Sequence, residues 1–286
     1  MSTERIVRRA GLLAGAGCAL LAPATAPALA RPVPAGRVPA IASAGAVTAR
    51  AHVAQRHASA FTASIGPSVR VMVVGAGNVV LVRPAEISLP AAIARTSHGN
   101  CGVAEGTALG ALVALNRSIG LSFALRDYGR CTSSPSSSGQ LFVSSIDGET
   151  NHGQNGWEYK VNGRSGTTGA ADPTGPFGTG RRIASGSKVL WFWCESFGGG
   201  CQRTLEVSVP ASVAHGASFT VRVTGDDNNG NGRPLSGATV TASASSAVTG
   251  SAGTVTLRAP ARGGLMSVRA SRPGSVPAFP AVVTVR

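Results

Sequence analysis

The sequence predicts an α+β domain with a mixed sheet and one helix, followed by an all-β sandwich. Three observations carry this prediction. Residues 156–194 contain all three tryptophans of the 286-residue chain and have the pattern of two strands of one sheet. Only residues 106–117 show the periodicity of a strong helix in the mature chain. From Leu205 onward, short alternating apolar segments are separated by Gly, Pro and Asn turns, as in β-sandwiches.

The aromatic segment predicts two strands with different surroundings. In Trp157–Val161 apolar and charged residues alternate, which is typical of a strand buried on one face. Asn162-Gly163 then supplies two residues that tolerate the positive φ of a tight turn. Residues 189–194 are apolar on both faces. One face carries Val189, Trp191 and Trp193, and the other carries Leu190, Phe192 and Cys194. This pattern predicts a central strand, or a strand whose second face is covered by another group.

Residues 1–30 have the features of an export signal. Arginines precede an apolar run over 10–21, and Ala28-Leu29-Ala30 offers a small-residue cleavage site. The run is short and no other stretch is long and apolar enough for a membrane helix, so we expect a secreted protein, with loose cell-wall association as an alternative. Arg8-Arg9 leaves both the general and the twin-arginine route open. Residues 31–67, rich in Ala, Pro and Arg, predict a disordered tether.

The mature chain is strongly basic. The whole chain carries a formal charge of +14, and residues 1–30 contribute +2 of it, which leaves +12. The arginines are scattered singly, with Arg181-Arg182 as the only adjacent basic pair of the mature chain. A nucleic-acid interface needs basic residues clustered on one face, so we expect no nucleic-acid partner. Weak attraction to anionic cell-wall polymers fits this distribution better.

Four cysteines remain after removal of the signal, and they predict disulfides. An even number in an exported chain favours disulfides, and four cysteines allow three pairings. Cys194 and Cys201 flank a six-residue loop, and Cys101 and Cys131 bracket the predicted helix, so we favour these two pairs. Loop entropy would contribute about 2.5 and about 3.7 kcal/mol, respectively. No metal site is expected, because the chain has no Cys-x2-Cys and His98 stands alone.

The helix is expected to begin after Thr107 as N-cap and to end at Gly120. Its apolar stripe is formed by Leu109, Leu112 and Val113. Further strands are expected at 69–74, 79–82, 121–128 and 141–148. Two strands, a helix and then several strands of a mixed sheet make a β-grasp arrangement over 68–204. One helix of about three turns covers one face of such a sheet and not both.

Four pieces of this region occur in the order seen in a known family. They are GTALGALVAL, LFVSSIDGE, GWEYKVNG and SGSKVLWFW. They resemble bacterial exported domains of unknown function related to the C-terminal β-domain of transcobalamin and intrinsic factor, over about Val69 to Glu195. The resemblance implies a β-grasp fold and, by analogy, ligand or surface binding. The vertebrate cobalamin carriers also have a large all-helical domain that supplies much of their cobalamin site, and we expect no counterpart of it in this chain. We therefore expect no cofactor, with cobalamin as the alternative.

Residues 205–286 contain no Cys or Trp and predict a second, all-β domain. They resemble the bacterial immunoglobulin-like modules attached to exported proteins, and Pro234–Val240 looks like a recurrent P-L-x-G-A-x-V strand entry of those modules. The expected strands are 205–209, 218–223, 238–243, 253–257, 265–270 and 281–285.

The sequence predicts no catalytic centre. Its five histidines are spread over the tether, the loops and the second domain, and its serines lack a nucleophile-elbow pattern. Asp227-x-Asn229-x-Asn231-Gly232 matches the first half of a calcium loop. Ala238 occupies the position that needs a bidentate Glu, so a hairpin tip is the better interpretation. We therefore expect a protein that is not an enzyme.

The aromatic residues are the candidate ligand-binding set. Trp157 and Tyr159 share one face of their strand, as do Trp191 and Trp193. Because one helix covers one sheet face, one face of strand 189–194 must be covered by the tether, the second domain or a ligand. An open aromatic face would bind a glycan or a flat cofactor. The competing interpretation is that all four side chains fill the core.

The leading hypothesis is an exported, non-catalytic binding or adhesion protein. Its partner would be a glycan, a cell-wall polymer or a small molecule, bound by a disulfide-linked β-grasp domain that an Ig-like spacer follows. The first alternative is a carrier for a small molecule of the cobalamin class. The second is a structural protein of the cell wall.

Overall fold

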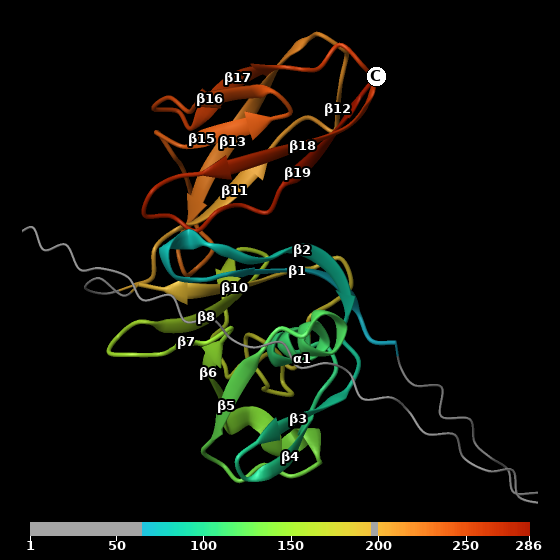
Figure 1. The fold of residues 1–286 in the computed structure, drawn as a ribbon, viewed down its shortest axis with the longest axis vertical. Helices are drawn as coiled ribbons and strands as arrows, with labels where there is room; N and C mark the ends of the chain where they lie inside the picture. Colours follow the sequence, from blue (N-terminus) through green and yellow to red (C-terminus); the bar gives the residue numbers. More distant parts are fainter. Residues whose placement is uncertain (1–64, 196–199) are drawn as a thin grey trace, which may run out of the picture. The chain divides into compact units, whose positions relative to one another are not determined.

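The computed structural model describes residues 65–195 and 200–286 (Figure 1). The expected export signal and nearly all of the expected tether lie outside the described residues. Strands dominate the described part, and α1 (Ala108–Ile119) is its one α-helix. This confirms a β-rich α+β fold. Within the described part, no helix has the length and hydrophobicity needed to cross a bilayer.

The N-terminal part, residues 65–195, is built on a five-stranded sheet in the order β2-β1-β10-β8-β9. β1 and β10 run parallel, and the other neighbours are antiparallel. The strands of this part are β1 (Ser68–Val74), β2 (Val80–Ser88), β3 (Ala92–Thr96), β4 (Gly99–Val103), β5 (Phe123–Asp127), β6 (Leu141–Ile146), β7 (Glu149–Thr150), β8 (Gly156–Val161), β9 (Arg164–Ser165) and β10 (Lys188–Cys194). Short 3-10 turns span Ala76–Asn78 and Pro135–Gln140.

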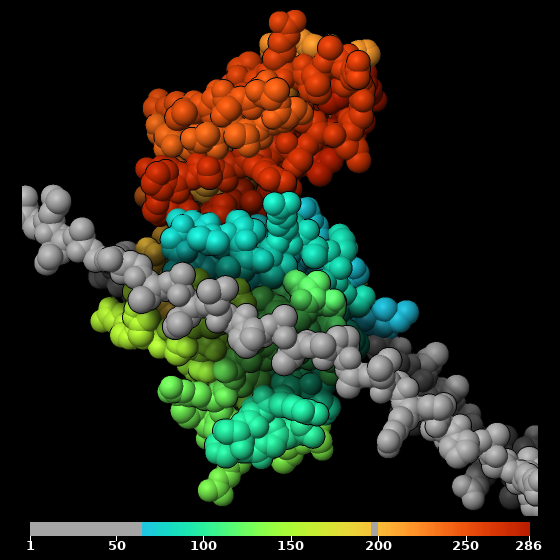
Figure 2. Space-filling model, in the orientation of Figure 1, coloured from blue at the N-terminus to red at the C-terminus, as the bar shows by residue number. Residues whose placement is uncertain are grey.

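Two smaller sheets accompany the main one. β5, β6 and β7 form a three-stranded sheet, and β3 and β4 form a hairpin. This hairpin was not predicted, because its strands carry glycine, asparagine and alanine in place of a regular apolar alternation. The hairpin lies at the surface of the N-terminal part, where Figure 2 shows it in teal in the lower half of the view.

The predicted local signals are confirmed. The side chain of Thr107 accepts a hydrogen bond from the Gly110 amide at 3.2 Å, as an N-cap does. Gly120 ends the helix at φ 74°, in the left-handed region that favours glycine. Asn162 and Gly163 have φ values of 51° and 85°, the double positive φ of the tight turn between β8 and β9.

One face of the main sheet packs against α1, which lies along one side of the sheet in Figure 1. Val189, Trp191 and Trp193 of β10 belong to the same core as the buried helix residues Leu109 and Leu112. The indole Nε1 of Trp191 donates to the carbonyl of Ala108 at 3.1 Å. The predicted tryptophan face of β10 is therefore the face that the helix covers.

The opposite face of the sheet is covered by the C-terminal part, residues 200–286. Leu190 and Phe192 lie in a separate apolar cluster with Val276 and Phe279. Phe279 is 7% exposed, and the cations of Arg70 and Lys188 lie 5.8 and 5.9 Å from its ring centroid. The candidates for covering this face were the tether, the second domain and a ligand. Among the described residues, those of the C-terminal part cover it.

The C-terminal part forms two sheets around its own core. One contains β11, β13, β14 and β17, and the other has the order β12-β19-β18-β15-β16. Their bounds are β11 (Thr204–Ser208), β12 (Ser212–Val213), β13 (Ser218–Asp226), β14 (Gly232–Pro234), β15 (Thr239–Ala242), β16 (Ser245–Val248), β17 (Thr254–Arg258), β18 (Gly264–Ser271) and β19 (Ala281–Val285). All six expected strands overlap these elements. The immunoglobulin-like and β-grasp assignments and the boundary near Thr204 stay predictions.

Phe279→Ala is predicted to lower the free energy of unfolding by about 3 kcal/mol, because it removes a buried ring from the cluster on the second sheet face. Denaturant unfolding followed by tryptophan fluorescence measures this loss. Leu265→Ala is the control, since Leu265 is 79% exposed and should change stability by less than about 0.5 kcal/mol. Equal losses in the two variants would show that Phe279 does not cover the sheet.

Candidate functional site

The four aromatic side chains predicted to bind a ligand are buried. Trp157, Tyr159 and Trp193 are each 5% exposed, and Trp191 is 1% exposed. Trp157 and Trp193 meet edge to face at 5.7 Å between centroids, and Tyr159 and Trp191 lie 5.5 Å apart. These rings pack mainly against each other and the first core, and they form no open aromatic face on these strands. The competing interpretation, in which they fill the core, describes the structure.

The polar atoms of the Trp157 and Tyr159 rings are satisfied internally. Trp157 Nε1 donates to the Glu149 carbonyl at 2.8 Å, and the Tyr159 hydroxyl donates to the Thr168 carbonyl at 3.0 Å. Burial raises the pKa of Tyr159. Gly166 is required here, because a Cβ at this position would come within 2.0 Å of the Tyr159 ring. The aromatic set is thus fixed as a unit of the core.

A small cavity of about 140 Å³ remains beside this core. Trp157, Tyr159 and Trp191 contribute to its wall, so three of the four predicted site residues do share one cavity. The rest of the wall comes from Leu141, Phe142, Val143, Glu158, Thr168, Gly169 and Ala170. This volume lies below the range of about 300–1,000 Å³ typical of small-molecule sites, so it admits a substituent and not a whole cofactor.

Among the residues that the structure describes, the exposed aromatic rings are Tyr128 and Phe142, which we call the ring pair. Tyr128 is 65% exposed and Phe142 is 44% exposed, and their centroids lie 6.2 Å apart at 50°. Phe142 points outward because its neighbours Leu141 and Val143 are buried on the other face of β6. Arg126, exposed on β5, stands directly opposite Phe142 in the strand register.

The ring pair was not among the residues predicted from the sequence, although one pattern points to it. In Leu141-Phe142-Val143-Ser144, strand alternation with Leu141 and Val143 inward places Phe142 outward. An outward Phe beside a second exposed ring forms an apolar patch, which is a candidate contact surface. Phe142 also lines the 140 Å³ cavity, so the ring pair and the cavity form one continuous surface feature.

Lys160 is a second residue whose place the sequence analysis did not predict. Alternation on β8 predicted a solvent-facing side chain, but Lys160 is 1% exposed because the C-terminal part covers that face. Its Nζ donates to Thr204 Oγ1 at 3.1 Å and to the carbonyls of Asp226 and Asp227 at 3.2 and 2.8 Å. All three ammonium protons thus have acceptors, and the contact joins β8 to the C-terminal part.

Burial lowers the pKa of Lys160 from its ordinary value of 10.5 to about 8, against the nearby charges of Asp226 and Asp227, which raise it. Burial also raises the pKa of Asp226. A second lysine at this junction, Lys188, is less enclosed and forms an ion pair with Glu206 at 2.6 Å.

Asp227 organises the turn that holds Lys160. Its Oδ1 accepts hydrogen bonds from the amides of Asn229 and Asn231, each at 2.9 Å. The bond from Asn231 is the main reason why the pKa of Asp227 is lowered. The segment that matches half of a calcium loop is thus the hairpin tip between β13 and β14. The Asp227 carboxylate there accepts hydrogen bonds from backbone amides of the same turn.

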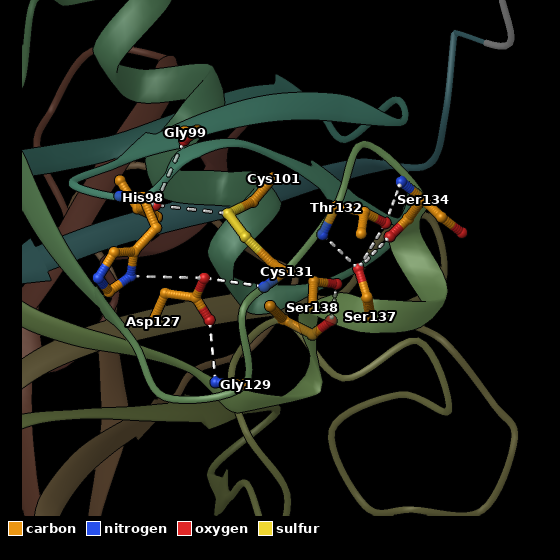
Figure 3. The surroundings of a disulfide bond; sticks show 12 residues. His98, Gly99, Cys101, Asp127, Gly129, Cys131, Thr132, Ser134, Ser137 and Ser138 are labelled. Atoms are coloured by element: carbon orange, nitrogen blue, oxygen red, sulfur yellow. Dashed lines mark hydrogen bonds and ion pairs between the residues drawn. A yellow bond between two sulfur atoms is a disulfide. The ribbon is translucent and has the colours of Figure 1, made fainter.

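Both favoured disulfides are present, Cys101–Cys131 and Cys194–Cys201. Figure 3 shows the first, beside Asp127. Cys101, Asp127 and Cys131 present their ligand atoms within 4.8 Å of one another, but the two sulfurs are bonded to each other and offer no thiolates to a metal. Asp127 accepts hydrogen bonds from the amides of Gly129 and Cys131 at 3.0 and 2.8 Å, and so shapes the loop.

Comparison with known proteins adds one finding. Residues 122–193 match the family described as a domain of unknown function, DUF4430. The matched segment is about a quarter of the chain, runs from the start of β5 into β10, and contains the buried aromatic set and the ring pair. No curated protein and no solved structure matches the chain significantly.

Lys160 predicts a pH dependence of stability. Between pH 8 and pH 10.5 the unfolded chain keeps a proton that the folded chain has released. The free energy of unfolding therefore rises with pH through this window, by at most about 3 kcal/mol. Lys160→Met should lose this rise, which denaturant titrations at a series of pH values measure.

Lys188→Met is the matched control, because Lys188 lies at the same junction but is less enclosed and paired with Glu206. This variant should keep the wild-type rise with pH. Parallel curves for the wild type and Lys160→Met between pH 7.5 and 9.5 would contradict the account of Lys160.

Proposed function

We propose that the protein is an exported, non-catalytic binding protein that holds a saccharide on the ring pair of Tyr128 and Phe142. The observation that carries the proposal is that these two rings are exposed and adjacent, 6.2 Å apart between centroids. Aromatic faces stack on the apolar faces of sugar rings, and two neighbouring rings extend such a contact along a chain. Arg126, opposite Phe142, adds hydrogen-bond donors for hydroxyl groups.

The cavity beside Phe142 supports the same ligand class. Its volume of about 140 Å³ suits a substituent projecting from a chain that lies across the surface. The carrier of the cobalamin class has less support, because the aromatic surface expected for a flat cofactor is buried. Within this proposal, the N-terminal part is a β-grasp domain that resembles the transcobalamin β-domain, and the C-terminal part is an Ig-like spacer.

Export fits the other features of the chain. Residues 1–30 have the pattern of a cleaved signal, and the two disulfides favour an oxidising compartment. The mature charge of +12 favours association with anionic cell-wall polymers. Secretion with loose wall association is therefore part of the proposal.

The double variant Tyr128→Ala/Phe142→Ala tests this function. Loss of two stacking rings at about 0.5–1.5 kcal/mol each should weaken saccharide binding by about fivefold or more. Isothermal titration of the mature chain with soluble cell-wall oligosaccharides measures the change. Thermal unfolding of the same variant should stay close to wild type, because both rings are exposed.

Leu265→Ala is the control, since it removes an exposed apolar side chain from the C-terminal part. It should leave saccharide affinity unchanged. The proposal fails if the wild type binds no oligosaccharide of the panel, or if the double variant binds as well as the Leu265→Ala control.

A further inference from the structure

A second cavity of about 420 Å³ lies between α1, the β3–β4 hairpin and β5. Its volume falls within the range of about 300–1,000 Å³ typical of small-molecule sites. The walls are formed by Ile93, Ala94 and Arg95 of β3, Asn100 of β4, Val113, Asn116 and Arg117 of α1, and Phe123 of β5. We call it the arginine cavity. None of its residues belongs to the ring pair, so the inference does not rest on the proposed function.

The folding pattern explains why the polar residues converge. Val113, Asn116 and Arg117 are spaced i, i+3 and i+4 and lie on one face of α1. Arg95 of β3 stands directly opposite Asn100 of β4, so both side chains project from the same face of the hairpin. Residues of both elements line the arginine cavity.

Arg117 is anchored at the boundary between the two faces. Its Nη2 donates to the carbonyl of Ile93 at 3.4 Å, which brings the guanidinium to the strand that carries Arg95. Asn116 is held by a bond from its Nδ2 to the Leu121 carbonyl at 2.9 Å. On the other face of the hairpin, the buried Cys101 joins β4 to Cys131 after β5. These links hold the cavity walls in place before a ligand arrives.

The lining has the chemistry of an anion site next to an apolar surface. It carries two guanidinium groups and no carboxylate. Neither Arg95 nor Arg117 takes part in the ion pairs found among the described residues. Guanidinium groups bind carboxylates through paired hydrogen bonds, and the partly buried ring of Phe123 offers an apolar contact.

We propose that the arginine cavity binds an acidic sugar unit of a glycan, a hexuronate whose carboxylate is held by Arg95 and Arg117. The sugar ring packs against Phe123 and Ile93, and the side chains of Asn100 and Asn116 face its hydroxyl groups. The protein thus recognises an anionic saccharide at a site separate from the ring pair, with the charge of the ligand as the basis of selection.

Binding of two matched oligomers by the mature chain tests the inference. The probes are an oligomer of galacturonic acid and the same oligomer with its carboxylates methyl-esterified, compared by isothermal titration. The wild type should bind the free acid at least about tenfold more tightly, and added salt should weaken this preference. Equal affinity for the two oligomers would overturn the inference.

Variants locate the site. Arg95→Gln/Arg117→Gln should abolish the preference for the free acid, and Arg95→Lys/Arg117→Lys should keep part of it, because charge is retained and the paired hydrogen bonds are lost. The exposed Arg222→Gln on β13 is the matched control and should bind as the wild type does. Equal losses in Arg222→Gln and Arg95→Gln/Arg117→Gln would overturn the site assignment.

Two further outcomes separate this inference from others. Tyr128→Ala/Phe142→Ala should keep the preference for the free acid even where it weakens binding to neutral oligosaccharides, so the two proposals fail independently. A poly(glycerol phosphate) probe tests the other anion of cell-wall polymers. Binding of that polymer through Arg95 and Arg117, without binding of the uronate oligomer, would overturn the assignment to an acidic sugar.

Discussion

The structure depends on one strand that cannot face water on either side. β10 carries Val189, Trp191 and Trp193 on one face and Leu190, Phe192 and Cys194 on the other, and all six are buried. Each face therefore needs its own apolar cover. α1 and the first core cover one face, and Val276 and Phe279 from the C-terminal part cover the other. The two parts are thus joined through the central sheet as well as through the chain.

Covering both faces of the sheet also buries a charged residue, Lys160. Apolar and charged residues alternate on β8 as they do in a sheet with one solvent-exposed face. The C-terminal part covers that face and excludes solvent from Lys160. The lysine then needs internal acceptors, and Thr204 with the turn at Asp226-Asp227 provides them. Burial of an ammonium group is unfavourable even when it is fully hydrogen-bonded, which is why its pKa is lowered. The hydrogen bonds of Lys160 also determine which turn of the C-terminal part contacts β8.

The sequence predicted those features that local chemistry determines. The caps of α1 at Thr107 and Gly120, the turn at Asn162-Gly163 and the two faces of β10 all follow from side-chain type and spacing. Covering of the second face depends on Val276 and Phe279, more than 80 residues after β10, and no local pattern specifies that contact. For the same reason the alternation on β8 predicts a solvent-facing Lys160, although this side chain is buried.

The sequence left open whether the aromatic residues of β8 and β10 form a surface or fill the core. They fill the core, and the exposed rings among the described residues are Tyr128, just after β5, and Phe142 on β6. The large aromatic residues of β8 and β10 are needed for the core. The arginine cavity was beyond sequence reasoning, because its two arginines come from a helix and from a hairpin that lacks a clear strand pattern. The exposed parts of both proposed surfaces thus come from the elements around the main sheet, and the cavity beside Phe142 reaches the rings of β8 and β10.

The accessibility of the tryptophans tests this account most directly, because Trp157, Trp191 and Trp193 are the only ones in the chain. Iodide quenching of their fluorescence in the folded protein, compared with the guanidinium-unfolded protein, reports whether water reaches the indoles. If α1 and the first core cover the tryptophan face of β10, the folded protein shows blue-shifted emission and almost no quenching. Quenching as efficient as in the unfolded chain would show that this face of the sheet is open and would contradict the account.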